Sequence, residues 1–509
     1  MPREIITVQV GQCGNQLGLS WWDLMLQEHL ANSAYTEARD ALFLTSPAYQ
    51  AATASSPRSK PGAAPPAAAA KDGIKARCVA VDLEEGVLAS LQRSKIGHLF
   101  DSNFFINDVS GAGNNWGVGH IEYGDKYIQP IQDTVRRQVE ACDCIQSFFI
   151  MHSLSGGTGS GLGTRVVGML EEEFPHILRI SPVVMPSIVD DVVTAPYNSC
   201  FAMKELIEHS DCVVPLDNDA LARMADRALK GGSPPGRDVF SAASPTQTKG
   251  LPYSSMNALV AQMLSNLTSA MRFPGPLNFD INEITTNLVP FPRLHFLTTA
   301  LAPLRVSERH ALVGPRTVDA MMAACLERDH QLVDFNTNVA SLPGGGGGGT
   351  GSSPYYSLNS ANAAGGGAVS GFSDTCLATA LIARGPQITI GDVNRNIQQL
   401  NKKLKLPYWN EDGFKTALCG VSPLGHKDSV LMISNSCGIT RKINFIYEKF
   451  AKLYAVRSHV HHYEAYLSRA YFDTTLEDIK TVLDDYSYLN TNSAVPQDAP
   501  KSMKDLVYY

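Results

Sequence analysis

The chain has 509 residues, 44% of them hydrophobic, and a formal net charge of −7. This length exceeds that of a usual single domain, and the hydrophobic content can supply one large core or two. The charge shows no basic excess that would point to nucleic acid, and no apolar run reaches the roughly 18 residues that a membrane span requires. We therefore expect a globular, multi-domain protein with no nucleic-acid or membrane partner.

Ten cysteines are scattered from Cys13 to Cys437, and no signal-like apolar segment opens the chain. This pattern favours reduced thiols in a cytosolic compartment, so we expect no disulfides. Metal binding is conceivable at Cys142-Asp-Cys144 and at the histidines of 459–462. The cysteine spacing is poor for zinc, and the histidines have no cysteines or second cluster near them in the sequence. We expect both groups to be packing residues.

The first expected element is a strand over residues 5–10, followed by the segment from Gly11 to Gln16 and then by a helical pattern. A strand-loop-helix opening places Gln12 and Cys13 at the carboxyl edge of a sheet, where open α/β sheets bind ligands. The amide of Gln12 could ligate phosphate or a metal-bound water. Cys13 taken alone would be a buried small residue.

A second strand is expected over residues 78–84, after an Ala-, Ser- and Pro-rich insert over about 40–72. It delivers two carboxylates at its end, Asp82 and Glu84. Glu84 is our candidate for holding Mg²⁺ through water, because magnesium prefers few carboxylates and several waters. A carboxylate at a strand end is more often only solvated. The loop over 110–116 could offer N–H groups, and the amide of Asn114, to phosphate oxygens.

The most informative stretch, residues 153–163, reads Ser-Leu-Ser-Gly-Gly-Thr-Gly-Ser-Gly-Leu-Gly and lies between an apolar run and a helical pattern. Its glycines allow backbone N–H groups to approach an anion closely, with a helix N-terminus behind them. No lysine follows, so this is not the Gly-x-x-x-x-Gly-Lys-Ser/Thr loop, and Gly-x-Gly-x-x-Gly cannot be drawn without forcing the spacing. We expect a phosphate-binding loop; a plain tight turn is the alternative.

Further strand-loop-helix units follow, which supports a parallel sheet. A strand over 212–216 is followed by Asp217 and Asn218. Asn218 could read a purine edge through its donor and acceptor groups, although a helix N-cap is the alternative for such a pair. After a second insert, a long helix carries Tyr253 and Asn257 at i, i+4 spacing, which suits stacking on and hydrogen bonding to one base.

Strands beyond residue 290, over 377–383 and over 430–434 predict a second α/β domain. Near its start, Asp280 and Glu283 lie three residues apart on one face of an expected helix, for which surface salt bridging is the usual meaning. The expected organisation is a nucleotide-binding domain over 1–252 with inserts at about 40–72 and 229–250, a central helix over 253–272, a second domain over 273–440 with a Gly-rich insert at about 340–373, and C-terminal helices over 441–509.

Gly-Gly-Thr-Gly-Ser-Gly at 156–161, taken with Gly11-Gln-Cys-Gly-Asn-Gln16, resembles the signature pair of the tubulin superfamily. Without the three inserts, the resemblance runs nearly from end to end. It implies an α/β, tubulin-like fold with a parallel-sheet GTP-binding domain, a central helix, a second, smaller α/β domain and a C-terminal helical hairpin.

This resemblance implies GTP or GDP as the ligand, with Mg²⁺ near Glu84 and Gln12 and the ribose near Asp191. The nucleotide-binding residues that it implies are Gly11, Gln12, Cys13, Gln16, Asn114, Ser153, Gly156, Gly157, Thr158, Gly159, Asp191, Asn218, Tyr253 and Asn257. Ser155 departs from the family pattern, which has glycine there. A serine requires an ordinary backbone conformation at this position.

In this family, GTP on one subunit is hydrolysed when the next subunit inserts an acidic residue, and Asp280-Ile-Asn-Glu283 resembles the α-type Asp-Leu-Thr-Glu. The resemblance therefore implies Glu283, aided by Asp280, as the catalytic group acting on a neighbouring subunit's GTP. Phosphoryl transfer depends mainly on positioning and charge stabilisation, so an isolated subunit should hydrolyse GTP slowly. A β-type subunit would carry lysine at the glutamate position.

Internal segments resemble the epsilon subfamily, although Met1-Pro-Arg-Glu-Ile-Ile resembles the γ-type opening. These segments are 108–116, 142–144, 190–192, 196–199, 202–206 and 461–463. An epsilon-type chain would be a cytoplasmic, cytoskeletal protein of the centrosome, centriole or basal body that supports doublet and triplet microtubules. Its partners would be delta-tubulin, α/β-tubulin and centriolar proteins. An ordinary filament subunit and a γ-type nucleator are the alternatives; the loop over 305–315 departs from the α and β pattern, which disfavours bulk incorporation into a microtubule lattice.

Overall fold

The computed structural model describes residues 3–33, 35–45, 73–187, 192–229, 252–305, 315, 317–335 and 374–493. The three expected inserts lie outside these residues, apart from 40–45 and 229. Asp191 and most of the loop over 305–315 also lie outside the described residues.

A parallel sheet of six strands forms the first part of the molecule. Its strands are β1 (Glu4–Val10), β4 (Cys78–Asp82), β5 (Phe105–Asn107), β6 (Ile145–Ser153), β7 (Leu178–Met185) and β8 (Cys212–Asp217). They lie in the order β5-β4-β1-β6-β7-β8, and every neighbouring pair is parallel. The chain builds outward from β1 first on one side and then on the other. The boundary between β1 and β6 is therefore the switch point at which open α/β sheets bind ligands.

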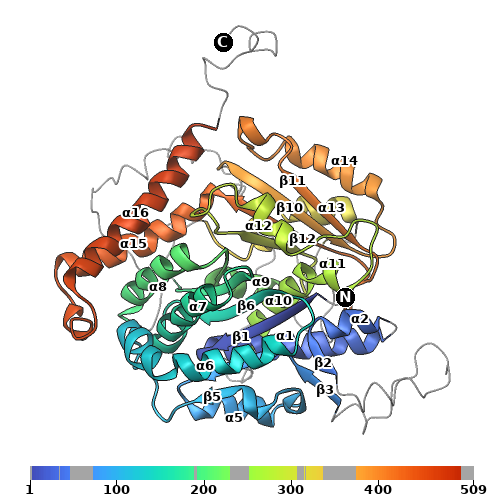
Figure 1. The fold of residues 1–509 in the computed structure, drawn as a ribbon. Coiled ribbons are helices and arrows are strands. Elements are labelled where there is room, and N and C mark those ends of the chain that lie inside the picture. Colours follow the sequence, from blue (N-terminus) through green and yellow to red (C-terminus); the bar gives the residue numbers. More distant parts are fainter. Residues whose placement is uncertain are drawn as a thin grey trace, which may run out of the picture.

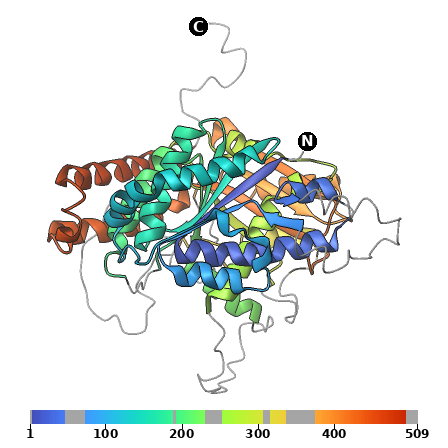
Figure 2. The ribbon, with the colours of Figure 1, turned by 60° about the horizontal axis from the view of Figure 1, so that its bottom comes forward.

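Helices cover both faces of this sheet (Figures 1 and 2). One face carries α1 (Gly11–Ala31), α5 (Glu85–Arg93), α9 (Asn218–Leu229) and α10 (Pro252–Leu267), and the other carries α6 (Tyr123–Glu140), α7 (Gly163–Glu173) and α8 (Ala195–His209). Side chains of β6 alternate between the faces, Phe149 and Met151 toward α1 and α10, Phe148 and Ile150 toward α7 and α8. Both faces are buried, which explains the continuous apolar run in its sequence.

The second sheet is mixed rather than parallel. Its strands are β9 (Thr298–Ala302), β10 (Cys376–Arg384), β11 (Phe414–Cys419) and β12 (Ser429–Ser436), in the order β11-β10-β12-β9. Only β10 and β11 run parallel, whereas β12 is antiparallel to both of its neighbours. Helices α13 (Val318–Ala324) and α14 (Ile390–Asn401) bury one face of this sheet, and α12 (Asn282–Leu288) precedes it in the chain. The expected α/β fold with a second, smaller sheet is confirmed.

A buried ionic cluster joins the two sheets. The helix expected over 253–272 is interrupted at Thr268, and a short helix α11 (Ser269–Arg272) follows. Arg272 Nη1 lies 2.8 Å from a carboxylate oxygen of Glu28 in α1, and Arg384 of β10 pairs with the other oxygen. Burial alone would raise the pKa of Glu28, but the two guanidinium groups hold it at about 2. Losing either arginine would leave a buried charge poorly compensated.

Two C-terminal helices, α15 (Thr440–Ala455) and α16 (Arg469–Thr491), form the hairpin drawn in red in Figure 1. Phe472 of α16 packs edge-on against Phe201 of α8, with ring centroids 5.0 Å apart. Tyr486 donates a hydrogen bond of 3.3 Å to Asn435 in β12. The hairpin therefore contacts both parts of the molecule.

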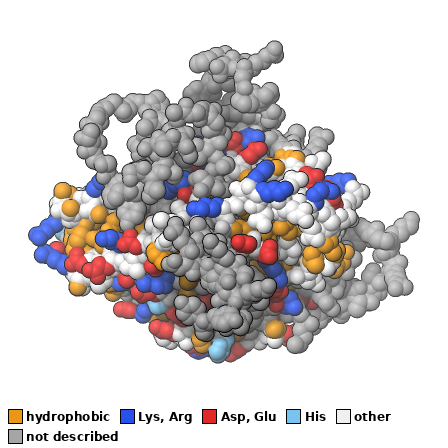
Figure 3. All heavy atoms as spheres, turned by 90° about the horizontal axis from the view of Figure 1, so that it is seen from above, with side chains coloured by type: hydrophobic (Ala, Val, Ile, Leu, Met, Phe, Trp, Pro, Cys, Tyr) orange, Lys and Arg blue, Asp and Glu red, His pale blue; other side chains and the backbone are white. Residues whose placement is uncertain are grey.

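Smaller elements include α2 (Thr36–Asp40) and a two-stranded ladder of β2 (Phe43–Thr45) and β3 (Ile74–Ala76). Among the described helices, none is long and apolar enough to cross a membrane. On the face seen from above Figure 1, acidic and basic side chains are interspersed with hydrophobic ones, and no basic field dominates the part that is coloured (Figure 3).

Candidate functional site

The loops that follow β1 and β6 meet at the switch point of the first sheet. Gly11 opens α1 with a φ of +74°, and a Cβ at this position would lie 3.1 Å from the backbone nitrogen of Gly159. Glycine is needed at position 11 for two reasons: the backbone there is left-handed, and the absence of a Cβ lets the two loops approach closely. Gln12 behind it is exposed, and Cys13 and Gln16 are half-buried. Burial raises the pKa of the Cys13 thiol to about 12, which favours its protonated form.

The glycine stretch after β6 forms a π-helical turn, Thr158–Leu162, that runs into α7. A Cβ on Gly157 would come 2.7 Å from the nitrogen of Asn115, and one on Gly159 would come 2.8 Å from the Ser153 hydroxyl. Glycine is thus required here for packing against neighbouring loops. None of these glycines has a positive φ, and Ser155 also has an ordinary one. The start of α1 lies beside the turn that runs into α7, and helix N-termini favour anions.

A third loop, from Gly111 to Trp116, closes over the same place. Gly113 and Asn114 both adopt left-handed backbone conformations, with φ of 55° and 54°. The carbonyl of Asn114 accepts hydrogen bonds from the Thr194 hydroxyl at 3.0 Å and from the side-chain amide of Asn198 at 2.8 Å. The Asn114 side chain remains exposed, and its carbonyl oxygen lies 4.0 Å from where a Cβ on Gly156 would be.

Asn198 on α8 holds the second and third loops together. Its amide also donates to the carbonyl of Ser155 at 2.9 Å, and its oxygen accepts the Trp116 N–H at 3.0 Å and the Tyr463 hydroxyl at 2.7 Å. It is fully buried. We did not predict this role from the sequence, which singled out 196–199 only for its family resemblance. A polar amide in the first turn of an apolar helix is the signal that could have revealed it.

Two carboxylates extend this edge on the β4 side. Asp82 is buried, burial raises its pKa to about 6, and its Oδ2 has no hydrogen-bond partner within the described part of the chain. Glu84 is exposed, and its Oε1 lies 2.7 Å from where a Cβ on Gly111 would be. Hard oxygen donors beside an anion cradle suit Mg²⁺, and the unpartnered Asp82 oxygen fits a water of such an ion. From the sequence, Glu84 and Gln12 are predicted to hold the metal, and no metal-binding role is predicted for Asp82.

Of the residues predicted to contact the base, Asn218 follows β8 at the same edge of the sheet, and Tyr253 and Asn257 lie in the first two turns of α10. Asp217 is the residue that caps α9, because it accepts the N–H of Asp219 at 3.2 Å, and it also pairs with Lys442 at 2.9 Å. The N-cap alternative for this Asp-Asn pair therefore holds through Asp217, and the side chain of Asn218 is half-buried at the start of α9. Tyr253 is 52% exposed at the start of α10. Asn257 is half-buried one turn later.

The structure does not bring Asp280 and Glu283 to these loops. Asp280 pairs with Arg3, just before β1, at 3.3 Å and accepts from Gln146, near the start of β6, at 3.4 Å. The two acids thus lie at the amino ends of the strands, roughly 26 Å from the carboxyl ends at 3.3 Å per residue along β6. Helix α12 begins only at Asn282, so the expectation of both acids on one helix is wrong: Asp280 precedes it, and its N–H donates to Glu283 Oε1 at 3.4 Å.

Of the two sequence clusters considered for metal binding, the cysteine cluster takes part in packing contacts, whereas His461 and His462 are exposed. Cys142 accepts a hydrogen bond from Arg77 at 3.1 Å, and the neighbouring backbone N–H groups of Asp143 and Cys144 bind the buried carboxylate of Glu4. Within the described ranges, no group of three or more metal-ligating side chains is suitably placed.

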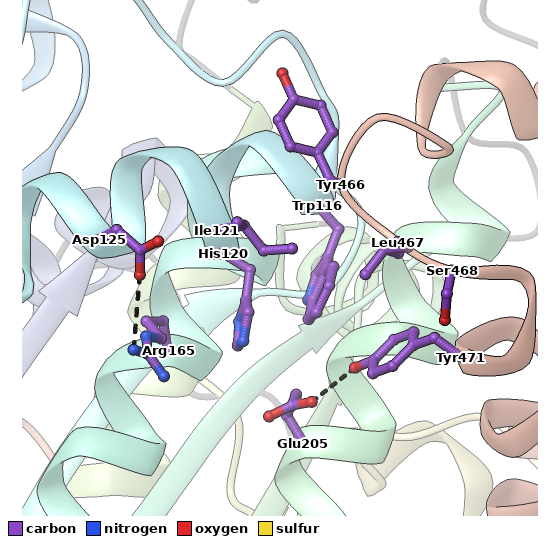
Figure 4. Close-up of a pocket in the computed structure, with 10 residues that line it drawn as sticks. All are labelled: Trp116, His120, Ile121, Asp125, Arg165, Glu205, Tyr466, Leu467, Ser468 and Tyr471. Atoms are coloured by element: carbon purple, nitrogen blue, oxygen red, sulfur yellow. Dashed lines mark hydrogen bonds and ion pairs between the residues drawn. The ribbon is translucent and has the colours of Figure 1, made fainter.

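A cavity of about 400 Å³ lies away from these predicted contacts, between α7, α8 and the start of α16 (Figure 4). Trp116 and His120 line one side, with ring centroids 4.2 Å apart, and Glu205 accepts a hydrogen bond of 2.7 Å from the hydroxyl of Tyr471. None of the residues predicted for the nucleotide lines it. Two of the lining residues also contact the loops of the site: Trp116 donates its N–H to Asn198, and His120 Nδ1 lies 3.1 Å from the carbonyl oxygen of Gly161.

Comparison with known proteins agrees with this geometry. The Tubulin/FtsZ family GTPase domain matches residues 4–226, and the Tubulin C-terminal domain matches residues 292–342 and 368–447. The chain is 37% identical to the tubulin epsilon chain of Mus musculus and 36% identical to that of Homo sapiens, in each case over 98% of both chains. It is 30% identical to the tubulin beta-1 chain of Mus musculus over 99% of this chain and 98% of the relative. The chain belongs to the tubulin family of GTP-binding cytoskeletal proteins.

Proposed function

We propose that this protein binds GTP at the carboxyl edge of its first sheet and acts as a structural subunit of centrioles and basal bodies. The observation that carries the first part is the cradle formed where three loops meet. Gly11 and Gly159 leave no room for side chains between the first two loops. The exposed amides of Gln12 and Asn114 can then face phosphate oxygens. Asp82, Glu84 and Gln12 would hold Mg²⁺, which offsets phosphate charge.

The guanine and ribose would lie beyond the phosphates. Asn218 and Asn257 offer donor and acceptor groups for the base, and the exposed ring of Tyr253 offers a stacking surface. Asp191 is proposed for the ribose on the strength of the family resemblance, because it lies outside the described residues.

Hydrolysis is proposed to occur in trans. Glu283 and Asp280 lie at the opposite end of the sheet from the cradle, so they cannot reach the chain's own nucleotide. Subunits stacked head to tail would bring them to the γ-phosphate of a neighbour. Glu283 would then orient a water and accept its proton as the water oxygen bonds to the γ-phosphorus and the bridging bond breaks.

The cellular role rests on similarity. The tubulin epsilon chains match over 98% of both lengths, which favours an epsilon-type role in supporting doublet and triplet microtubules. Delta-tubulin, α/β-tubulin and centriolar proteins are the proposed partners. Tagged protein should localise to centrioles or basal bodies, and its depletion should leave singlet microtubules there. A uniform distribution along cytoplasmic microtubules would contradict this role.

The biochemical test is the nucleotide content and turnover of the purified chain. We expect bound guanine nucleotide, and turnover that appears only when a partner tubulin is added and is lost in Glu283→Ala. Glu448→Ala is the matched control, because Glu448 forms a surface ion pair with Lys452 on α15. Absence of any bound guanine nucleotide would overturn the site assignment.

An ordinary filament subunit is the second candidate, favoured by the 30% identity to a beta-1 chain over nearly the full length. Co-pelleting with microtubules separates the two functions. Stoichiometric entry into the lattice would support a filament subunit, and substoichiometric association limited to seeds would support nucleation of the γ type. Neither behaviour is expected of a centriolar subunit.

A further inference from the structure

The activating acid proposed above is not free in this chain. The carboxylate of Glu283 forms an ion pair with the ammonium group of Lys415, the second residue of β11. The two side chains are 36% and 33% exposed, respectively, so the pair lies at the surface. A neighbouring subunit can therefore reach both groups.

The other charged groups around Glu283 come from two further segments. Asp280 places its backbone N–H 3.4 Å from Glu283 Oε1, and its own carboxylate pairs with Arg3 at 3.3 Å. Each acid of this surface thus has one basic partner on the same chain. Of the two bases, Lys415 is the one in contact with the acid proposed to act on GTP.

We propose that Lys415 is a positioning residue that pairs with Glu283 in the free chain and transfers to the γ-phosphate of a neighbouring subunit's GTP on docking. The inference rests on the proposed activation in trans. It assigns Lys415 a phosphate contact that is made only across the subunit boundary.

Electrostatics favours this exchange of partners. A carboxylate approaching a triphosphate has the same sign of charge as its target, so Glu283 needs a cation between them. An exposed lysine–carboxylate pair contributes little stability, and a flexible lysine can leave it at small cost. A phosphate with several negative charges attracts the ammonium group more strongly once docking has excluded water.

The exchange also explains why hydrolysis would wait for docking. In the free chain, the pKa of Glu283 is lowered mainly by Lys415, through its hydrogen bond and its charge. A carboxylate with a lowered pKa is a weaker base for the attacking water. Moving the lysine to the phosphate restores that basicity at the moment when the substrate is in place.

The test compares the wild-type chain with Lys415→Met, Lys415→Arg and the control Lys452→Met, whose lysine pairs with Glu448 at 3.7 Å. The first readout is the affinity for a partner tubulin loaded with either a non-hydrolysable GTP analogue or GDP. We expect the wild type and Lys452→Met to favour the analogue-loaded partner by about tenfold, because one charge-assisted contact to phosphate is gained. Lys415→Arg should keep part of this preference and Lys415→Met should lose it.

The second readout is the pH dependence of turnover in the docked state. Without Lys415, the pKa of Glu283 rises beside the phosphate, so the loss of turnover on acidification should begin at a higher pH in Lys415→Met than in the wild type. A merely structural role would lower turnover equally at every pH.

The outcomes separate this inference from the proposed function. An unchanged analogue preference in Lys415→Met overturns the inference, even where Glu283→Ala abolishes turnover and activation in trans stands. If Glu283→Ala turns over like the wild type, activation in trans is wrong, and the affinity comparison still decides whether Lys415 contacts the phosphate.

Discussion

The side-chain amide of Asn198 donates a hydrogen bond of 2.8 Å to the backbone carbonyl of Asn114. This bond fixes a left-handed residue in the third loop of the cradle to the first turn of α8. The same amide reaches Ser155 in the glycine loop at 2.9 Å. One buried side chain therefore sets the relative position of two loops that are far apart in the sequence.

Replacing this side chain tests its role. Asn198→Leu keeps the approximate volume but leaves two loop carbonyls and the Trp116 N–H without their partner. We expect a loss of about 2–4 kcal/mol in unfolding free energy, since each unsatisfied buried group costs about 1–3 kcal/mol. Nucleotide retention on gel filtration should fall at least about tenfold, because 1.4 kcal/mol is a factor of ten in binding. Asn444→Leu is the control, since Asn444 is half-buried on α15 and donates a hydrogen bond of 3.0 Å to the side chain of Glu448. Nucleotide retention equal in the two variants would contradict this role.

The glycines of the loop should be sensitive to a single methyl group. Gly157→Ala would place a Cβ 2.7 Å from the Asn115 nitrogen, whereas a Cβ on Gly86 in α5 meets no atom within 4 Å. We expect Gly157→Ala to lose bound nucleotide and Gly86→Ala to keep it, with a stability gain of about 0.5–1 kcal/mol for the helical position. Nucleotide content after purification, together with thermal melting, tests both. Retention of nucleotide by Gly157→Ala would show that the loops can separate without loss of function.

Asp82 should matter for metal-dependent retention of nucleotide more than for the fold. Its buried carboxyl has a pKa raised to about 6, so Asp82→Asn should not destabilise the apo chain. We expect EDTA to accelerate nucleotide release from the wild type at least about tenfold, a change of about 1.4 kcal/mol, and to have little effect on Asp82→Asn. The matched control is Glu85→Gln, an exposed acid one residue after Glu84. An EDTA effect that is the same in Asp82→Asn and the wild type would exclude Asp82 from the metal site.

Buried histidines should make the fold labile to acid. Burial lowers the pKa of His152 and His295 to about 4, and that of His29 to about 3, from an ordinary value of 6.5. At a pH between these lowered pKa values and 6.5, each of the three histidines is protonated in the unfolded chain and neutral in the folded chain. Each histidine therefore contributes stability that is complete above pH 6.5 and is lost as the pH falls toward 4, at up to about 1.4 kcal/mol per pH unit. Asp82, with its raised pKa, acts in the opposite direction and offsets part of this loss.

Calorimetry between pH 7.5 and 5 checks this expectation, at nucleotide concentrations that keep the site equally occupied. The thermal midpoint should fall with pH, and His295→Gln should flatten part of the slope. A midpoint independent of pH over this range would mean that these histidines do not stay neutral in the folded chain.

Much of the fold could be predicted from the sequence because its signals are local. The apolar run of β6 and the glycine loop after it identify a strand, a turn and a helix start within about twenty residues of one another, a span over which local patterns are informative. The mixed order of the second sheet could not be predicted in the same way. Its pairing of β12 with β9 and β10 is set by contacts between distant segments.

The candidate site also has one part that could be predicted from the sequence and one part that could not. Gly11, Asn114 and Gly159 could be named from motifs, whereas the joining role of Asn198 depends on carbonyls 84 and 43 residues away. The position of Glu283 at the far end of the sheet also depends on topology, since Asp280 beside it is fixed by contacts with Arg3 and Gln146. The residue types of this acid pair can be read from the sequence, and only the fold shows that the pair lies away from the cradle of its own chain.

The central claim is that the nucleotide and the group that activates its hydrolysis belong to different subunits. The most direct measurement is the hydrolysis rate of pre-bound GTP, per molecule of wild-type chain, over a dilution series with and without partner tubulins. We predict a hydrolysis rate that vanishes on dilution and rises with the concentration of the docking partner. The rate should be lost when the subunit that supplies the acid carries Glu283→Ala. A rate per bound GTP that is the same at every dilution, with or without a partner, would contradict the account.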